Sequence, residues 1–359
     1  PPRSTPKPSS AASDVYKRQM EYERVTFPEA VRLLASRVGI EIKEEAGRET
    51  GEIDRLLRAN EVARDYYSSI LFNKEGEMAR LYLKKRGLSS EVLDAFSLGF
   101  APDRVDGLLQ FAKAKGIRLR DLIDAGIVVE RDGRYYARFW NRLVFPILDH
   151  RGRVVGFGGR VLEDREPKYI NSPETPVYNK SKLLYGIFQC KDAIRREGFA
   201  FLVEGYVDLL SLYQRGIKNV VAPLGTALTA YQARLLKRFT DEVAVLYDGD
   251  DAGKKAAYHA VEVLFSEGLG FHILSLPSGM DPDDFVKREG KEALYHLHSS
   301  DGIGFVCSVL DEQGASLSEK IREVRRIISL VGDPDKKFEL VKKAVSILNV
   351  REDLFTTAC

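Results

Sequence analysis

The fold is decided by the stretch Phe199-Ala-Phe-Leu-Val-Glu204-Gly-Tyr-Val-Asp208, a hydrophobic run that ends at an acidic residue and then passes into a helical pattern. Three further short hydrophobic runs follow it, at residues 219–222, 242–247 and 271–276, with helical patterns between them. Such alternation of strands and helices predicts a parallel sheet with right-handed crossovers. We therefore expect residues 198–290 to form an α/β unit with a Rossmann-like parallel sheet.

Acidic residues follow three of these four predicted strands. They are Glu204 and Asp208 after the first strand, Asp248 and Asp250 after the third, and Asp281 and Asp283 after the fourth. Because the functional sites of open α/β sheets lie beyond the carboxyl ends of the strands, we expect these carboxylates to converge. Two of them would repel each other by up to about 4 kcal/mol at roughly 4 Å and an effective dielectric of about 20, so the cluster needs a cation. A site of several carboxylates suits Mg²⁺ or Mn²⁺ far better than zinc, and it predicts metal-assisted phosphoryl transfer.

Each acidic pair also has a structural explanation when it is taken alone. Asp-Gly is a common turn, and aspartate is a common cap at a helix start. Turns and caps explain less readily why acidic pairs recur at three strand ends. A calcium-binding EF-hand over residues 248–259 is excluded, because Ala252 and His259 stand where that motif needs ligands.

A basic segment precedes the predicted parallel sheet. Seven arginines lie between residues 131 and 160, opposed by only two aspartates, and aromatic residues are interleaved with them. Cationic grooves with aromatic platforms hold single nucleic-acid strands without reading their sequence. Most charges of such a run nevertheless face solvent, and we expect Phe139, Phe145 and Phe157 to be core. Short β-type runs broken by glycines predict a mixed α+β fold for residues 131–187.

Composition bounds the function only broadly. The chain has 359 residues, 44% of them hydrophobic, and a formal net charge of +2, which neither demands nor excludes a polyanionic partner. The three cysteines include no C-x-x-C pair, so we expect neither a disulfide framework nor a zinc ribbon, and a reduced cytoplasmic compartment. Without a run of about 18 apolar residues, no membrane-spanning segment is expected.

Helices are expected on both sides of the sheet-forming segments. Residues 1–19 are rich in Pro and Ser and predict a disordered leader or an assembly scar, with folded sequence from about Met20. Helical patterns cover residues 27–35 and, as one long amphipathic stretch, 53–85. Beyond Glu289 we expect helices only, among them 318–328 and 336–348, with a break at residues 332–334.

Several of these motifs together resemble a known family. Four of them, listed in chain order, are similar to the successive motifs of the Toprim domain as it occurs in bacterial DnaG-type DNA primases: Glu204-Gly-Tyr-Val-Asp208, Leu224-Gly-Thr-Ala227, Tyr247-Asp-Gly-Asp-Asp-Ala-Gly253 and Asp281-Pro-Asp283. The resemblance continues upstream through Tyr82-Leu-Lys-Lys-Arg-Gly-Leu-Ser89, Gly99-Phe-Ala-Pro102, Arg138-Phe-Trp-Asn-Arg142, Gly156-Phe-Gly-Gly-Arg160 and Pro167-Lys-Tyr-Ile-Asn-Ser-Pro-Glu-Thr175. It covers residues 20–354.

The resemblance implies roles for particular residues. Catalytic and metal-binding roles fall to Glu204, Asp248 and Asp250, further metal ligation to Asp281 and Asp283, and a supporting place at the metal to Asp208. Six basic residues would contact template phosphates or the triphosphate: Arg86, Arg138, Arg142, Arg160, Lys168 and Lys180. Trp140 departs from the pattern, because many primases have an arginine at this position.

The resemblance also implies an activity and partners. The expected reaction condenses ribonucleoside triphosphates on a single-stranded DNA template into short RNA primers, with Mg²⁺ or Mn²⁺ as cofactor. Full-length family members add an N-terminal zinc ribbon and a C-terminal helicase-binding domain. We expect only the polymerase core here, without zinc, in the cytoplasm at the replication fork, and with the replicative helicase bound through a domain absent from this chain. The expected parts are a leader (1–19), a basic α+β subdomain (20–197), the Toprim subdomain (198–290) and a helical subdomain (291–359).

Two other functions stay open at this stage. A Toprim nuclease or topoisomerase would use the same acids to cleave DNA, but a topoisomerase needs a nucleophilic tyrosine on a separate domain. The chain has 16 tyrosines, and no segment offers itself for that role. A non-catalytic Toprim DNA-binding module would need neither the intact acidic set nor the basic segment.

Overall fold

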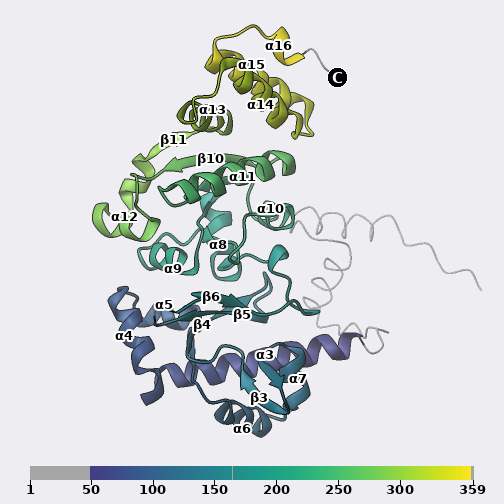
Figure 1. The fold of residues 1–359 in the computed structure, drawn as a ribbon, viewed down its shortest axis with the longest axis vertical. Helices are drawn as coiled ribbons and strands as arrows, with labels where there is room; N and C mark the ends of the chain where they lie inside the picture. The colour runs from purple at the N-terminus through teal and green to yellow at the C-terminus, as the bar shows by residue number, and fades with distance from the viewer. Residues whose placement is uncertain (1–48, 164, 357–359) are drawn as a thin grey trace, which may run out of the picture. The chain divides into compact units, whose positions relative to one another are not determined.

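A computed structural model of the chain describes residues 49–163 and 165–356 (Figure 1). The chain divides into two compact units, residues 1–51 and 52–359, and the elements below belong to the second unit apart from the first residues of α3. The predicted leader, the start near Met20 and the helix at 27–35 lie outside the described residues.

The predicted parallel sheet is present. Its parallel strands are β7 (Phe199–Leu202), β8 (Val220–Val221), β9 (Glu242–Val245) and β10 (Gly270–Ser275). A fifth strand, β11 (His298–Ser300), is antiparallel to β10, and the order across the sheet is β11-β10-β9-β7-β8. The prediction of an α/β unit with a Rossmann-like sheet is thus confirmed.

Strand β11 departs from the expectation that only helices follow Glu289. A short 3-10 helix, η3 (Glu292–His296), precedes it. The residues of β11 are exposed or half-buried and contain no hydrophobic run, and main-chain pairing with Ile273 to Ser275 of β10 fixes them in place. A strand held in this way has no apolar alternation by which the sequence could reveal it.

Helices flank the parallel sheet, and side-chain caps fix where several of them begin. The helices are α8 (Ile187–Glu197), α9 (Tyr206–Gln214), α10 (Ala230–Lys237), α11 (Asp251–Glu267) and α12 (Pro282–Glu289). Thr229 closes a capping box at α10, and Asp250 and Asp281 cap α11 and α12. Phe201 and Leu202 of β7 are both buried although their side chains point to opposite faces, so both faces of the sheet are covered there.

The basic segment folds, as predicted, into a mixed α+β arrangement, built on an antiparallel sheet. Strands β1 (Gly99–Ala101), β4 (Arg142–Leu148), β5 (Val154–Val161) and β6 (Tyr169–Asn171) pair in that order, and β2 (Val128–Arg131) and β3 (Arg134–Ala137) form a separate hairpin. The accompanying helices are α3 (Glu49–Leu71), α4 (Glu77–Lys85), α5 (Ser90–Ala95), α6 (Asp106–Ala114), α7 (Leu119–Asp124) and the short η2 (Lys180–Lys182). Phe139, Phe145 and Phe157 are fully buried, which confirms that they are core.

The single long helix predicted over residues 53–85 is wrong, because the chain breaks between α3 and α4. A 3-10 turn, η1 (Lys74–Gly76), separates the two helices, and the Asn73 side chain caps it. Gly76 packs so closely that an added Cβ would lie 2.3 Å from the carbonyl oxygen of Leu71. The pattern hid this break because polar residues and a single glycine also fit an exposed helical face. Met78 is accordingly exposed rather than part of an apolar stripe.

Tyr206 joins the two sheets. Its ring stacks on Phe145 with 4.9 Å between the ring centroids, and it meets Tyr185 edge-on at 4.7 Å. Its hydroxyl donates to Asn171 Oδ1 over 2.7 Å. An added Cβ at Gly158 would lie 2.7 Å from that hydroxyl oxygen. Glycine on β5 therefore serves close packing against the residue that opens α9.

Helices make up the remainder of the described chain. They are α13 (Gly302–Glu312), α14 (Leu317–Ser329), α15 (Pro334–Leu348) and α16 (Asp353–Thr356), and α14 and α15 confirm the predicted pair. Asp333 caps α15 at the predicted break, and Val324, Ile327 and Ala344 are buried in the core beneath them. Among the described residues, no helix has both the length and the apolar character that crossing a membrane demands.

Candidate active site

The fold brings the predicted acidic residues together at the carboxyl ends of the parallel strands, which we call the acidic edge. Glu204 follows β7, Asp248 and Asp250 lie between β9 and α11, and Asp281 lies between β10 and α12. These three strands are neighbours, in the order β10-β9-β7. A hydrogen bond joins two of the turns directly, because the Asp248 amide donates to Glu204 Oε1 over 3.0 Å. Asp208 lies in the first turn of α9, next to the same edge.

Glycine fixes the path of the turn that carries Asp248 and Asp250. An added Cβ at Gly249 would lie 2.3 Å from the carbonyl oxygen of Pro277, and one at Gly253 would lie 2.1 Å from the carbonyl oxygen of Asp248. Both contacts are to main chain, so a larger residue would have to move the backbone. The directions of the two carboxylates therefore depend on these glycines.

Two of the acids also act as helix caps. Asp250 Oδ1 accepts a hydrogen bond from the Gly253 amide over 2.8 Å, and Asp281 Oδ1 accepts one from the Asp284 amide over 2.7 Å. The structural explanation for these residues is therefore correct. It does not conflict with ligand binding, because a cap occupies one carboxylate oxygen and leaves the other as an acceptor.

Burial and mutual repulsion make these carboxylates hard to ionise together. Burial raises the pKa of Asp248 to about 7, and the neighbouring carboxylates of Glu204 and Asp281 add to the shift. The pKa of Asp208 is also raised to about 7, first by burial and then by Asp248 and the other acids. Burial likewise raises the pKa of Glu204. Asp248 Oδ1 is buried without a hydrogen-bond partner. Such a cluster ionises readily only when a cation compensates it.

Asp283 is placed differently from the other acids. It is fully buried, and its Oδ2 lies 2.6 Å from Lys287 Nζ and 3.4 Å from Arg86 Nη1. Its Oδ1 accepts a hydrogen bond from the Ser211 hydroxyl. Both carboxylate oxygens therefore already have partners within the protein. Helical spacing could have suggested Lys287, but Arg86 is 197 residues away in the sequence. Metal ligation by Asp283, which the family resemblance implies, stays a prediction.

No three His, Cys, Asp or Glu side chains are arranged to hold a metal ion as they lie, within residues 49–163 and 165–356. The acidic side chains are still close enough to raise one another's pKa. Their donor atoms are all carboxylate oxygens, which suit a hard divalent cation. The chemistry of these side chains therefore fits a divalent cation such as Mg²⁺.

Two of the predicted basic residues hold the main chain near β6. Arg142 is buried and donates to the carbonyl oxygens of Pro167 and Lys168 over 3.0 and 3.2 Å. Arg138 donates twice to the carbonyl oxygen of Asn171, over 3.2 Å each. Burial is the main cause that lowers the pKa of each arginine. These contacts were not visible in the sequence, and they give both arginines a structural role.

The other predicted basic residues are either exposed or surrounded by aromatic rings. Lys168 and Lys180 have exposed side chains. The guanidinium carbon of Arg160 lies 4.3 Å from the ring centroid of Tyr82 and 5.6 Å from that of Tyr169. Tyr169 in turn lies 6.1 Å from the ring of Tyr206, which follows Glu204 in the acidic turn. The basic and acidic sides therefore meet through aromatic side chains.

Trp140, where the sequence departs from the family pattern, lies at the surface. Its side chain is exposed, and the guanidinium carbon of Arg165 lies 4.1 Å from its ring centroid. A cation over a tryptophan face is a favourable contact. Many family members have an arginine at this position. Here Trp140 instead contacts the guanidinium of Arg165.

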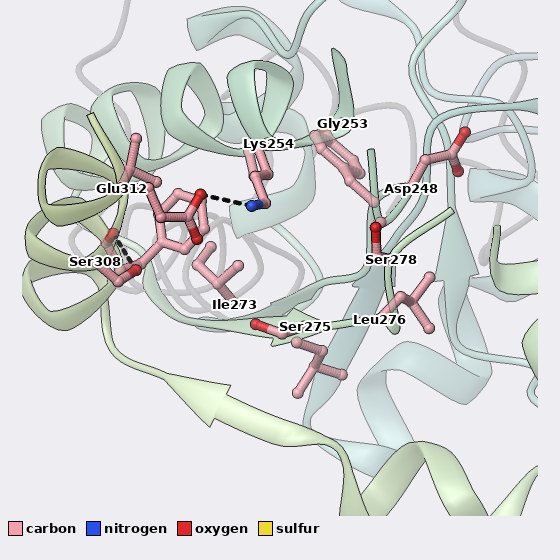
Figure 2. Close-up of a pocket in the computed structure, with 15 residues that line it drawn as sticks. Asp248, Gly253, Lys254, Ile273, Ser275, Leu276, Ser278, Ser308 and Glu312 are labelled. Atoms are coloured by element: carbon pink, nitrogen blue, oxygen red, sulfur yellow. Dashed lines mark hydrogen bonds and ion pairs between the residues drawn. The ribbon is translucent and has the colours of Figure 1, made fainter. Parts of the chain in front are cut away.

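A pocket of about 260 Å³ lies beside the turn that carries Asp248. Its walls are β10, the start of α11 and α13, and they include Ile273, Leu276 and Phe305. Lys254 and Glu312 form an ion pair of 2.6 Å that ties α11 to α13. In Figure 2 the Asp248 carboxylate points away from this ion pair. The pocket therefore lies next to the turn that carries Asp248, but the Asp248 carboxylate does not point toward its Lys254–Glu312 wall.

Two family models and several curated proteins match this sequence. Residues 66–191 match the family model described as the N-terminal domain of the DNA primase catalytic core, and residues 201–286 match a Toprim-like model. The chain is 41% identical over 332 residues to the DNA primase of Aquifex aeolicus (strain VF5), covering 92% of this chain and 65% of that protein. It spans about half to two thirds of the length of the curated relatives it matches.

Solved structures agree with the sequence comparison. The structure of the Aquifex aeolicus primase with its zinc-binding and RNA polymerase domains has a TM-score of 0.77 and 37% identity, covering 96% of this chain and 84% of that one. A DnaG primase catalytic domain bound to single-stranded DNA has a TM-score of 0.76 and 36% identity, covering 85% of this chain and 99% of that one. These similarities do not favour the nuclease, topoisomerase or binding-only alternatives.

Proposed function

The chain belongs to the family of bacterial DnaG-type DNA primases, and we propose that it is their RNA-polymerising core, which joins ribonucleotides into short primers on single-stranded DNA. The observation that carries this proposal is the hydrogen bond between Glu204 and the Asp248 amide, which holds two acidic turns together at the carboxyl edge of the sheet. The unpartnered Oδ1 of Asp248 beside it supports a ligand at that point.

Primases with a Toprim domain use divalent metal ions, and we propose Mg²⁺ or Mn²⁺ for this chain. The proposed ligands are Glu204, Asp248, Asp250 and Asp281, with Asp208 supporting them and Asp283 retained from the family resemblance. When bound, the ions would lower the pKa of the attacking 3′-hydroxyl and offset charge on the phosphates. The carboxylates themselves would fix where that charge compensation acts, because the glycine-dependent turns hold Asp248 and Asp250 in place.

The basic residues would position the template and the nucleotide, which is most of what phosphoryl transfer asks of a protein. Exposed Lys168 and Lys180 are suited to direct phosphate contact. Arg86 and Arg160 lie at the junction with the acidic edge, next to Tyr82 and Tyr169. Arg138 and Arg142 would act mainly by shaping the wall of β5 and β6. The DNA-bound catalytic domain of a relative supports a single-stranded DNA template.

The remaining parts of the proposal concern organisation. We retain the division into a basic part (20–197), a Toprim part (198–290) and a helical part (291–359), in which β11 adds a strand to the Toprim sheet. The substrates would be ribonucleoside triphosphates and the product an RNA primer. In the longer relatives, other domains would bring in the replicative helicase and place the enzyme at the fork.

Replacing Asp248 tests this function. The Asp248→Ala variant should lose at least about a hundredfold in primer synthesis on single-stranded DNA with Mg²⁺, the scale expected when electrostatic stabilisation of the transition state is weakened, because Asp248 would hold the cation that supplies it. It should bind a single-stranded oligonucleotide like the unchanged protein, because in the proposed arrangement the basic residues, and not the acids, would contact template phosphates. Asp284→Ala is the matched control, since Asp284 is an exposed carboxylate on the neighbouring helix. Full synthesis by a folded Asp248→Ala protein would refute the assignment.

A further inference from the structure

Tyr82 contacts two of the basic residues at once. It lies on α4 and is half-buried. Arg86 Nε donates a hydrogen bond to the Tyr82 hydroxyl over 3.1 Å. The guanidinium of Arg160 lies over the face of the same ring, 4.3 Å from its centroid. Arg86 follows α4 and Arg160 belongs to β5, so one aromatic side chain organises cations from two different elements.

Arg160 depends on aromatic rings because polar partners are scarce. Only 7% of its surface is exposed, and its Nε has no hydrogen-bond partner. Among the described residues, no carboxylate forms an ion pair with it. A buried cation without a carboxylate is unfavourable unless something else stabilises the charge. The faces of Tyr82 and Tyr169 do so here, through the negative potential of their π-systems.

Two contacts orient the guanidinium of Arg86. Its Nε donates to Tyr82, and its Nη1 lies 3.4 Å from Asp283 Oδ2. Within the described part of the chain, its Nη2 makes no hydrogen bond. The guanidinium is planar and is attached through Cδ, so these two contacts together with that attachment set the direction of the remaining nitrogen. A planar donor held in this way is well suited to a phosphate oxygen.

We propose that Tyr82 is a positioning residue for this reaction: its hydroxyl orients Arg86 and its ring holds Arg160, so that both arginines are preset for phosphate groups. The inference rests on the proposed function, in which these two arginines bind phosphates of the template or of the triphosphate. Tyr82 needs to touch neither ligand. Its two contacts are chemically separable, because phenylalanine keeps the ring and loses only the hydroxyl.

Two substitutions separate the contacts of Tyr82. Tyr82→Phe should weaken binding of fluorescein-labelled oligo(dT) or of ATP about threefold, the effect of losing one modest hydrogen bond. Tyr82→Leu should weaken it further, and the slope of log affinity against log salt should fall by up to about 0.7 for each DNA phosphate contact that is lost. A purely structural role would lower the melting temperature without changing that slope. Tyr295→Phe and Tyr295→Leu are matched controls, because Tyr295 is an exposed tyrosine on η3.

Double substitutions test whether Tyr82 acts through Arg86. In an Arg86→Ala background, Tyr82→Phe should have no further effect, whereas in an Arg160→Ala background it should keep its full effect. A change with oligo(dT) alone assigns the preset arginines to the template, and a change with ATP alone assigns them to the triphosphate. If Arg86→Ala and Arg160→Ala bind both probes like the unchanged protein, the proposed phosphate role of these arginines fails. If they weaken binding while Tyr82→Phe does not, or if the effects of Tyr82→Phe and Arg86→Ala simply add, positioning by Tyr82 is overturned and the proposed function stands.

Discussion

The acidic edge of the parallel sheet and the basic face of the antiparallel sheet treat their charges in opposite ways. At the acidic edge, burial raises the pKa of both Asp208 and Asp248, and the neighbouring carboxylates raise it further. On the basic face, Arg142 donates to carbonyl oxygens and Arg160 lies between aromatic rings. The fold therefore leaves one set of charges uncompensated and compensates the other from within. We infer that the carboxylates need a bound cation to compensate their charge. The arginines, in contrast, are already held in place without a bound phosphate.

Asp283 is an exception among the acids, because the protein already compensates its charge with Lys287 and Arg86. We expect Asp283→Ala to lower the free energy of unfolding by about 3 kcal/mol, the lower end for breaking a buried ion pair, since Lys287 and Arg86 are about one third exposed. Asp248→Ala should instead raise the free energy of unfolding in metal-free buffer, because it relieves repulsion between carboxylates. Urea unfolding of both variants, with Asp284→Ala as control, measures this. Equal stability of Asp283→Ala and the unchanged protein would contradict the ion-pair account.

The pH dependence of stability should report the uncompensated charges. The folded-state pKa values of Asp208 and Asp248 are raised to about 7, above the ordinary value of about 3.9 in an unfolded chain. Their contribution to stability is therefore fully present below about pH 4 and is lost as pH rises through about 7, since the unfolded state binds fewer protons in that window. After discounting for partial exposure, we expect a loss of about 2 kcal/mol without metal.

Asp248→Asn should flatten this profile, because an amide does not titrate. Added Mg²⁺ should also reduce the loss at neutral pH, since it would bind the ionised carboxylates. Urea unfolding at a series of pH values, in EDTA and in Mg²⁺, provides both measurements. A profile that stays unchanged in Asp248→Asn would show that this carboxylate is not the source.

Arg142 should behave as a structural residue although it is basic. Arg142→Met keeps most of the side-chain volume but leaves the carbonyl oxygens of Pro167 and Lys168 without their donor. We expect a loss of about 1–2 kcal/mol in the free energy of unfolding. Arg134→Met on β3 is the control, because Arg134 is exposed. If Arg142→Met kept full stability and lost only DNA affinity, Arg142 would belong with the phosphate-binding residues instead.

Lys168 and Lys180 should sharpen the comparison through the salt dependence of DNA binding. Each exposed lysine that contacts a phosphate should add about 0.7 to the slope of log affinity against log salt for single-stranded DNA. Lys168→Ala and Lys180→Ala should each lower that slope by this amount and leave the melting temperature unchanged. The exposed Lys342 on α15 offers a matched substitution outside the basic face. Slopes that match the unchanged protein in both variants would place the template elsewhere.

Trp140 should show the smallest effect. Trp140→Arg would remove the ring beneath Arg165 and place two guanidinium groups close together. We expect a loss of roughly 0.5 kcal/mol in stability, the scale of an exposed cation–π contact. If the position faces the template, DNA binding at low salt should tighten. Unchanged DNA affinity would identify Trp140 as a residue that organises Arg165 rather than one that marks the template path.

The sequence predicted the acidic edge better than the basic face, for a physical reason. Hydrophobic runs that end at Glu204 and before Asp248 are local, and parallel strands must bring their carboxyl ends together. Arg86, Arg142 and Arg160 each have at least one partner from a distant segment, and the partners of Arg142 are carbonyl oxygens, which every residue possesses. The break at η1 and the short strand β11 were missed because neither carries an apolar period.

Tyr206 has a consequence for how the two sheets move. Its ring begins α9 beside the acidic turn, yet it packs among Phe145 and Tyr185 under the antiparallel sheet, and its hydroxyl is bonded to Asn171. Separating the sheets would therefore expose an aromatic ring and break a hydrogen bond in one step. Amides of β4 and β7 should then exchange with solvent as a single cooperative unit rather than one sheet before the other. Motion during a catalytic cycle would be confined to side chains and turns, on a frame that opens only when it unfolds.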